Sequence, residues 1–289
     1  MTEHHEFAPA KVNLYLHITS RREDGYHDLD SLVAFSNIGD EVVLRPSAEF
    51  GFEIVGPQAA VLSHENPDDN LVVKAARSLA ELTGNRLNVH LTLIKKLPLA
   101  SGIGGGSSDA AAALRVLAQY WGLAKDDPRI EEAAARHGQD VPVCVKVENN
   151  YMTATGVAPA PKLPRAHIVL VNPNKALSTP SVYKEYRNGG DAFSPLSRLA
   201  QAPINLEELI GALQSRGNDL YAPACRLMPE IADIIEVLRK TENCLLARMS
   251  GSGATCFGIY VDAISAQVAA EKIRVEHSTW WIEPGEINI

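Results

Sequence analysis

Cysteine, positive charge and long apolar runs are all scarce in this sequence of 289 residues. The four cysteines, Cys144, Cys225, Cys244 and Cys256, lie far apart and form no Cys-x-x-Cys pair. Neither a disulfide framework nor a zinc site is therefore indicated, and we expect buried thiols in a reducing compartment. The formal net charge of −8 disfavours a general nucleic-acid-binding protein, because such proteins need a basic surface to meet phosphates.

Membrane segments are not indicated either. No apolar run approaches the roughly 20 residues that span a bilayer. The first residues, MTEHHEFAPAKVNLYLHI, lack the basic stretch followed by an apolar stretch that marks a signal peptide. We expect a cytoplasmic protein that binds neither membranes nor nucleic acid. The chain is 46% hydrophobic and 21% charged, which is typical of a globular protein with one large domain or two lobes.

Strand and helix patterns alternate along the chain, which predicts an α/β or α+β protein in two lobes. Apolar and polar residues alternate strictly over KVNLYLHI, residues 11–18, so this segment is expected to be a half-buried strand. Further strands are expected at residues 40–46, 50–56, 86–97, 140–148, 167–173, 244–249 and 256–261. Helices are expected at residues 69–82, 107–121, 130–137, 179–186, 206–215, 229–240 and 263–274. Asp68 or Asp69 is the candidate cap of the first helix.

A proline-rich segment, GVAPAPKLPRA at residues 156–166, has little periodicity. It is the best candidate for a linker. The sequence therefore predicts an N-terminal lobe over residues 1–160 and a C-terminal lobe over residues 161–289.

The segment PLASGIGGGSSDAAAAL places glycines directly before a predicted helix. A flexible surface loop is one interpretation, but three consecutive glycines after Ile103 make it less attractive, because each loses conformational entropy on ordering. A strand, a glycine loop and a helix N-terminus together form an anion site, because unpaired N–H groups point outward there. Ser107 and Ser108 can cap this helix or offer hydroxyls to a phosphate or a metal ion.

Neither common phosphate-binding motif fits this loop. A Walker motif would require Gly-Lys-Ser/Thr, and the dinucleotide motif would require a third glycine three places after the second. A second short turn, Gly251-Ser252-Gly253, lies between two apolar strands and by itself indicates a hairpin. Two such turns in one chain favour a nucleotide or phosphate ester held between the lobes.

Three separated segments, APAKVNLYL, LPLASGIGGGSSDAAAAL and MSGSGATCFGIY, resemble the three motifs of the GHMP kinases in order and spacing. The middle one resembles that family's phosphate loop, with Ile103 where leucine is more usual. The resemblance implies an α+β, two-lobed GHMP kinase fold. Its N-terminal lobe would be like ribosomal protein S5 domain 2, and its C-terminal lobe would be α+β. It also implies phosphoryl transfer from ATP with Mg²⁺.

Other segments narrow the resemblance within this family. The stretches HITSRREDGYHDLDSL, DNLVVKAARSL, HGQDVPVCV and LSTPSVY are similar to those of GHMP kinases that phosphorylate the 2-hydroxyl of 4-diphosphocytidyl-2-C-methyl-D-erythritol in non-mevalonate isoprenoid synthesis. A GHMP kinase for another small alcohol, such as homoserine or mevalonate, is the alternative, and it would not need the aromatic pair Tyr26 and Tyr183. An S5-like nucleic-acid-binding module is a further alternative that the acidic charge opposes.

Two residues match the family's catalytic pair. On residue type alone, Lys11 is a surface charge on a strand and Asp140 a turn or cap residue. The resemblance implies that Asp140 is the general base and that Lys11 is its electrostatic partner. Whether Lys11 acts mainly on Asp140 or on the transferred phosphoryl group stays open.

The resemblance also implies two sets of binding residues. Those for ATP are Asn70 and Lys95, near the adenine and ribose, and the loop Pro98, Leu99, Ala100, Ser101, Gly102, Ile103, Gly104, Gly105, Gly106, Ser107 and Ser108. Those for the second substrate are Asn13, Tyr26, His27, Thr179, Tyr183, Gly251, Ser252 and Gly253. Lys95 and Lys96 have a second interpretation as charges at a strand end. We expect Mg²⁺ to bind mostly through phosphates and water, without a named protein ligand, and the chain to be a monomer or a weak homodimer.

Overall fold

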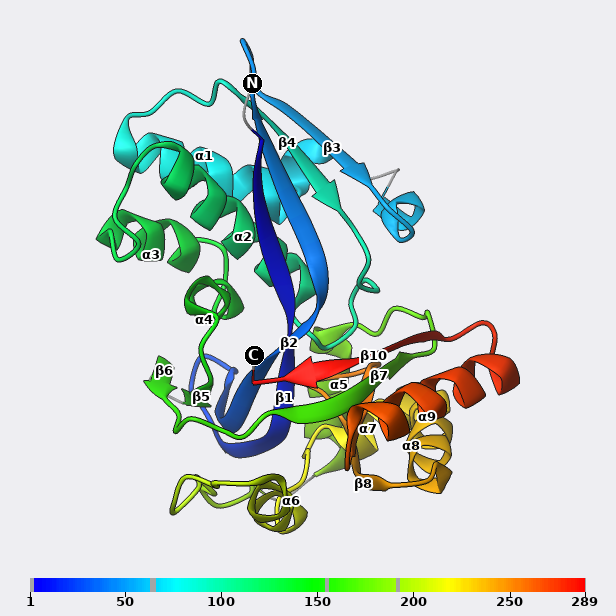
Figure 1. Cartoon of the computed structure of the whole chain (residues 1–289). Coiled ribbons are helices and arrows are strands. Elements are labelled where there is room, and N and C mark those ends of the chain that lie inside the picture. Colours follow the sequence, from blue (N-terminus) through cyan, green and yellow to red (C-terminus); the bar gives the residue numbers. More distant parts are fainter. Residues whose placement is uncertain (1–2, 63–65, 154–155, 191–192, 289) are drawn as a thin grey trace. The chain divides into compact units, whose positions relative to one another are not determined.

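The computed structural model describes residues 3–62, 66–153, 156–190 and 193–288, and the chain divides into two compact units (Figure 1). Unit 1 comprises Met1–Ala10, Gly39–Leu99 and Gly104–Glu148, and unit 2 comprises Lys11–Ile38, Ala100–Ile103 and Asn149–Ile289. Two long strands, β1 (His4–Arg21) and β2 (His27–Pro46), contribute to both units. The units therefore interleave along the chain, and the division near residue 160 stays a prediction.

Unit 1 is a sheet covered by helices. Strand β3 (Gly51–Val55) runs parallel to β4 (Val89–Ile94), and β4 pairs antiparallel with the end of β2, from Glu41↔Ile94 to Pro46↔Val89. Figure 1 shows the main helices of this unit on one side of β3 and β4. These main helices are α1 (Leu71–Thr83), α2 (Gly105–Tyr120) and α3 (Pro128–Ala135). The unit also contains the shorter helices η1 (Ala59–Leu62), η2 (Pro67–Asp69) and α4 (Asp140–Lys146).

Small side chains let α1 and α2 pack closely. The four alanines Ala110–Ala113 of α2 are fully buried, and α2 packs against α1 and α4. The cap of α1 is Asn70, whose side chain accepts a hydrogen bond from the Val72 N–H. The expectation that Asp68 or Asp69 caps this helix was wrong. Both aspartates belong to η2, and the residue next to the helix supplies the cap.

The segment predicted as a strand over residues 140–148 is helix α4 instead. Its valines alternate in sequence, which is typical of a strand. The buried residues nevertheless include Val141 and Cys144, which share one face of a helix. Pro142 is in the first turn, where its missing N–H breaks no helical hydrogen bond. Packing against α2 has overridden the strand propensity of valine.

Unit 2 contains the other strands of the sheet. Its strands follow the order β2, β10 (Trp281–Ile287), β7 (Ala166–Asn172), β9 (Cys256–Tyr260) and β8 (Cys244–Met249), and β5 (Asn150–Thr153) pairs with β2 and with β6 (Gly156–Pro159). The helices are α5 (Thr179–Gly189), α6 (Leu206–Gln214), α7 (Tyr221–Leu227), α8 (Glu230–Lys240) and α9 (Ala263–Glu276). Helix α8 packs on β8 and β9, and α9 packs on β7 and β10.

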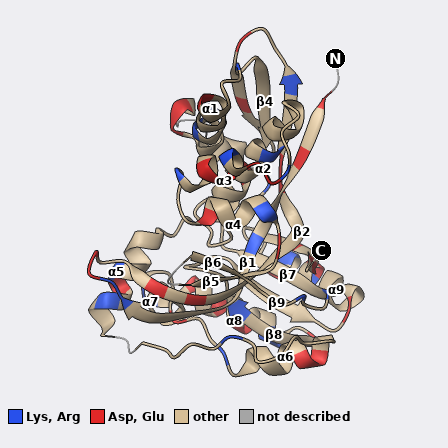
Figure 2. Cartoon of the chain, turned by 90° about the vertical axis from the view of Figure 1, so that its left-hand side faces the viewer, with Lys and Arg blue, Asp and Glu red and all other residues tan. Residues whose placement is uncertain are grey.

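Most predicted elements of unit 2 are confirmed, including β7, β8 and β9. The sequence did not predict β5, β10 or α7, and the segment read as a linker begins with strand β6. All four cysteines are free thiols: Cys144 and Cys256 are buried, whereas Cys225 and Cys244 are half-buried. Figure 2 shows Lys and Arg interspersed with Asp and Glu along the ribbon. Over the described part of the chain, no helix is both long and apolar enough to cross a membrane.

Candidate active site

The glycine-rich loop ends at the N-terminus of α2, as the sequence predicted. Gly104 is the N-cap residue with a left-handed backbone (φ 65°), and it makes no side-chain cap hydrogen bond. The first N–H groups of an α-helix have no partner within the helix. Those of Gly105 and Gly106 are therefore available to an anion. Of the two roles considered for Ser107 and Ser108, capping is wrong, because both residues lie inside the helix.

The Ser108 hydroxyl is already engaged within unit 1. Its side chain is fully buried and donates a hydrogen bond of 2.7 Å to the Pro9 carbonyl. This bond ties the first turn of α2 to strand β1. Ser107 is only half-buried, and it is the serine of this turn with the more accessible hydroxyl.

The two glycine turns meet inside unit 2. The Thr255 N–H donates to the Ser101 carbonyl (3.0 Å), and the Ser250 hydroxyl donates to the Gly102 carbonyl (3.1 Å). The backbones are so close that a Cβ on Gly102 would lie 2.6 Å from the carbonyl oxygens of Ser250 and Gly253. The start of the loop and the turn at Gly251–Gly253 therefore pack directly against each other, although they lie far apart in sequence.

Lys11 and Asn13 lie beside these turns on β1. The Lys11 N–H donates to the Ile103 carbonyl (2.9 Å), and the Asn13 N–H donates to the Ser250 hydroxyl (3.0 Å). Lys11 is only 5% exposed, so it is not the solvated surface charge that its residue type suggested, and its Nζ is 3.6 Å from Met152 Sδ. The Asn13 Nδ2 donates to Ser31 Oγ. Asn13 Oδ1 is buried without a hydrogen-bond partner among the described residues.

Two of the residues that were expected to bind the second substrate, His27 and Tyr183, lie together in unit 2. The His27 and Tyr183 rings stack at 5.3 Å, and Tyr186 meets His27 edge-on at 5.7 Å. Tyr26 is 67% exposed. Burial, followed by the charges of Arg187 and Arg21, lowers the pKa of His27, so its imidazole is neutral near pH 7.

Thr179 connects the start of α5 to the second glycine turn. Its hydroxyl is 2.7 Å from the Ser252 hydroxyl. Both residues were expected at the second substrate, and the structure places them together in unit 2.

Asn70 lines a cavity of about 310 Å³ in unit 1. Its side-chain oxygen accepts from the Val72 N–H, which leaves the Asn70 amide NH₂ as a donor. The cavity walls are mainly apolar, which suits the faces of a flat heterocycle. The lining residues are Phe52, Glu53, Ile54, Ala59, Ala60, Leu62, Asn66, Pro67 and Asn70.

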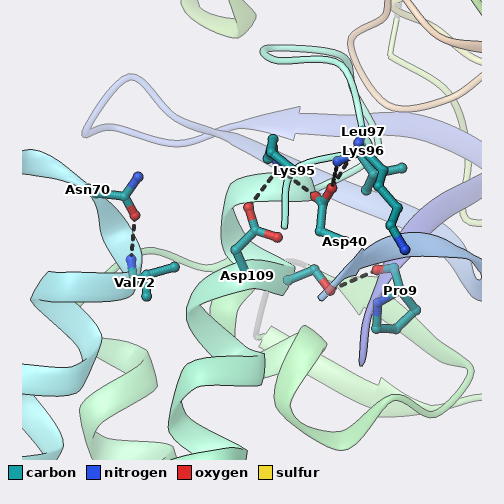
Figure 3. Close-up of polar contacts among 9 residues, drawn as sticks. Pro9, Asp40, Asn70, Val72, Lys95, Lys96, Leu97 and Asp109 are labelled. Atoms are coloured by element: carbon teal, nitrogen blue, oxygen red, sulfur yellow. Dashed lines mark hydrogen bonds and ion pairs between the residues drawn. The ribbon is translucent and has the colours of Figure 1, made fainter. Parts of the chain in front are cut away.

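Lys95 directly follows strand β4, but it is not an ordinary solvated charge at a strand end. Its side chain is 1% exposed, and Nζ donates to Asp40 Oδ2 (2.5 Å) and to Asp109 Oδ2 (2.6 Å), as Figure 3 shows. Its ammonium is thus committed to carboxylates, and the nucleotide contact expected for Lys95 stays a prediction. Sequence reasoning missed Asp40 and Asp109. The available signal was that Asp109 directly precedes the buried alanines of α2, on a helix face where an unpaired charge is rare.

Asp140 begins helix α4 and is half-buried. Among the residues that the structure describes, no group of three or more His, Cys, Asp or Glu side chains could hold a metal ion.

Two family domains cover much of the chain. The GHMP kinases N terminal domain matches residues 70–147, and the GHMP kinases C terminal domain matches residues 199–277. Among solved structures, one of 4-(cytidine 5'-diphospho)-2C-methyl-D-erythritol kinase superposes with a TM-score of 0.80 at 30% identity, over 98% of this chain and 99% of that one. Homoserine kinase from Cytophaga hutchinsonii shares the fold, with a TM-score of 0.66 at 19% identity over 99% and 94% of the two chains.

Curated relatives match over almost the full length. A protein of Rhodospirillum rubrum is 46% identical over 278 residues, which are 96% of this chain and 90% of that relative. One of Paramagnetospirillum magneticum is 45% identical over 283 residues, or 97% of each chain. Both are named 4-diphosphocytidyl-2-C-methyl-D-erythritol kinase.

Proposed function

The chain belongs to the 4-diphosphocytidyl-2-C-methyl-D-erythritol kinases of the GHMP kinase superfamily, and we propose that Asp140 and Lys11 carry its chemistry. The reaction is transfer of the γ-phosphoryl group of ATP to the 2-hydroxyl of 4-diphosphocytidyl-2-C-methyl-D-erythritol, in non-mevalonate isoprenoid synthesis. The observation that carries this function is near-full-length identity of 42–46% to relatives of that name.

In the proposed mechanism, Asp140 accepts the proton of the 2-hydroxyl as the oxygen attacks phosphorus. Phosphoryl transfer depends mainly on positioning and on stabilising charge over the equatorial oxygens. Lys11 supplies a positive charge from a side chain that is almost fully buried, where water screens it little. Its ammonium would stabilise negative charge at Asp140 or on the transferred group.

We propose that ATP binds along unit 1. The open N–H groups of Gly105 and Gly106 would hold phosphate oxygens, and the Asn70 cavity would hold the adenine. Mg²⁺ would neutralise charge on the phosphates. We propose that phosphate oxygens and water would hold this ion, because Mg²⁺ keeps much of its hydration.

Unit 2 would hold the second substrate. Tyr26 and Tyr183 would stack on the cytosine, and His27 would meet the edge of the base. The unpartnered Asn13 Oδ1 is an acceptor for a hydroxyl of the methylerythritol part. Thr179 would contact the sugar or methylerythritol part, and the turn Gly251–Gly253 would close over the diphosphate. The proposed setting is the cytoplasm, with the chain as a monomer or weak homodimer.

The direct test is a coupled ADP-release assay with Mg-ATP and each of three alcohols. The expected result is turnover with 4-diphosphocytidyl-2-C-methyl-D-erythritol and none with homoserine or mevalonate. Turnover with another alcohol would retain the kinase and contradict the substrate. ADP release with none of them would contradict the function.

The lowered pKa of His27 predicts how cytidine binding depends on pH. Neutral His27 can accept a hydrogen bond from the cytosine amino group, and the protonated ring cannot. Because the pKa lies below the ordinary value of about 6.5, affinity should be constant from pH 8 to pH 7 and fall below that range. The loss by pH 5.5 should be smaller than the roughly tenfold that an imidazole of ordinary pKa would give, as measured by calorimetric titration with cytidine.

His27→Gln is the matched control, since its side chain does not titrate in this range. The variant should bind cytidine more weakly than the wild type at pH 7.5, with no further loss at pH 5.5. An equal pH dependence in this variant would show that another group is responsible.

A further inference from the structure

We infer that Lys95 is a positioning residue for the first turn of α2, where the phosphates would bind. Hydrogen bonds to Asp40 and Asp109 hold its ammonium in place. This inference rests on the proposed function, because it takes the first turn of α2 as the site of the ATP phosphates. It assigns the Lys95 ammonium to the support of that turn instead of to the nucleotide.

The Lys95 ammonium lies next to the first turn of α2. A Cβ placed on Gly105 would be 3.2 Å from Lys95 Nζ, so only a glycine leaves the ammonium its present place without a shift. On the next turn of the same helix, Asp109 Oδ2 accepts from Nζ at 2.6 Å. The Lys95 ammonium therefore lies beside Gly105, which begins α2, and is hydrogen-bonded to Asp109 one turn later.

Asp40 extends these contacts to the strand that leads into the loop. Its Oδ2 accepts from Lys95 Nζ, and its Oδ1 accepts from the N–H groups of Lys96 (2.5 Å) and Leu97 (2.8 Å). Figure 3 shows this carboxylate between the ammonium and the two N–H groups. The carboxylate fixes the backbone just before Pro98, which is the first residue of the phosphate loop.

The Lys95 backbone reaches the wall of the Asn70 cavity. Its N–H donates to the Val55 carbonyl (2.7 Å), and its carbonyl accepts from the Gln58 N–H (3.1 Å). Ile54 precedes Val55 in the chain and Ala59 follows Gln58, and both Ile54 and Ala59 line that cavity. One residue thus joins the proposed adenine site, through its backbone, to the proposed phosphate site, through its side chain.

The charges of the cluster suit a phosphate site. Burial raises the pKa of Asp109 well above its ordinary range, and the Asp40 carboxylate adds to that effect against the opposing influence of Lys95. Burial alone would lower the pKa of Lys95, but the two carboxylates raise it, so the ammonium stays charged. The charged ammonium beside this turn favours bound phosphates. Asparagine at position 109 would keep the shape of the side chain and an oxygen that accepts from the Lys95 ammonium.

The test compares ADP with adenosine, because adenosine lacks the phosphates that the turn would hold. Calorimetric titration would be carried out on the wild type, Lys95→Met, Asp109→Leu and Asp109→Asn. Lys95→Met and Asp109→Leu should each weaken ADP binding about 30-fold, or about 2 kcal/mol, while adenosine affinity changes less than about threefold. Asp109→Asn should stay within about threefold of the wild type for both ligands. In turnover, the KM for ATP should rise in the two damaging variants and the KM for the cytidyl substrate should not.

Three results would overturn the inference: unaltered ADP binding by Lys95→Met, equal losses of ADP and adenosine, or equal damage by Asp109→Asn and Asp109→Leu. Equal losses of both ligands would indicate a general folding role. If Lys95→Met does not fold, the Asp109 pair decides, since those variants keep the ammonium. Failure of the wild type to bind ADP would overturn the proposed function as well, whereas the other results overturn this inference alone.

Discussion

Asp140→Asn is expected to lower kcat by about 1,000-fold or more while ADP affinity stays within about threefold of the wild type. Asparagine keeps the size of the side chain and can still begin α4, so the variant should fold. It cannot accept the proton of the attacking hydroxyl. The measurements are kcat from coupled ADP release with 4-diphosphocytidyl-2-C-methyl-D-erythritol, and ADP affinity from calorimetry.

The matched control is Asp126→Asn, the same chemical change at an exposed position between α2 and α3. It should keep full turnover and ADP affinity. Near-normal turnover in Asp140→Asn would contradict the role of general base. A parallel loss of ADP binding would mean that the carboxylate serves nucleotide binding and not proton transfer.

The parts of the fold that could be predicted are those specified by neighbouring residues. The glycines and the alanine run predicted the loop and α2 because one set permits a left-handed turn and the other a closely packed helix. The turn at Gly251–Gly253 was predicted in the same way, from two apolar strands separated by small residues. Neighbouring residues in the sequence do not show that these two turns pack on each other through Ser250 and Gly102.

The missed elements depend on distant partners. Strand β10 contains Pro284 and Gly285, which read as a turn, yet it pairs with β7 along its whole length. Its strand pairing with β2 is at Ile287↔Ser36, so the missing N–H of Pro284 removes no hydrogen bond from that pair. The Lys95 cluster likewise requires β2, β4 and α2 to be assembled first, because Asp40 and Asp109 are 55 and 14 residues away from Lys95. No local pattern around Lys95 could show that its charge is buried.

Gly102→Ala is expected to lower the free energy of unfolding by about 3 kcal/mol or more and to weaken ADP binding severely. Gly102 has φ 74°, a left-handed backbone that costs alanine about 1–2 kcal/mol. Its Cβ would also lie 2.6 Å from the carbonyl oxygens of Ser250 and Gly253, and 2.7 Å from the Gly253 nitrogen. Backbone atoms cannot swing aside as a flexible side chain can, so the two turns would have to separate.

Gly190→Ala isolates the clash from the backbone strain. Gly190 belongs to the same unit and has φ 66°, but a Cβ there would meet nothing within 4 Å. The control should therefore lose only the strain of about 1–2 kcal/mol and keep its ADP affinity. Denaturant unfolding and calorimetric titration of both variants give the comparison. Equal losses of stability in the two variants would show that the contact between the turns contributes nothing, because only Gly102 lies in that contact.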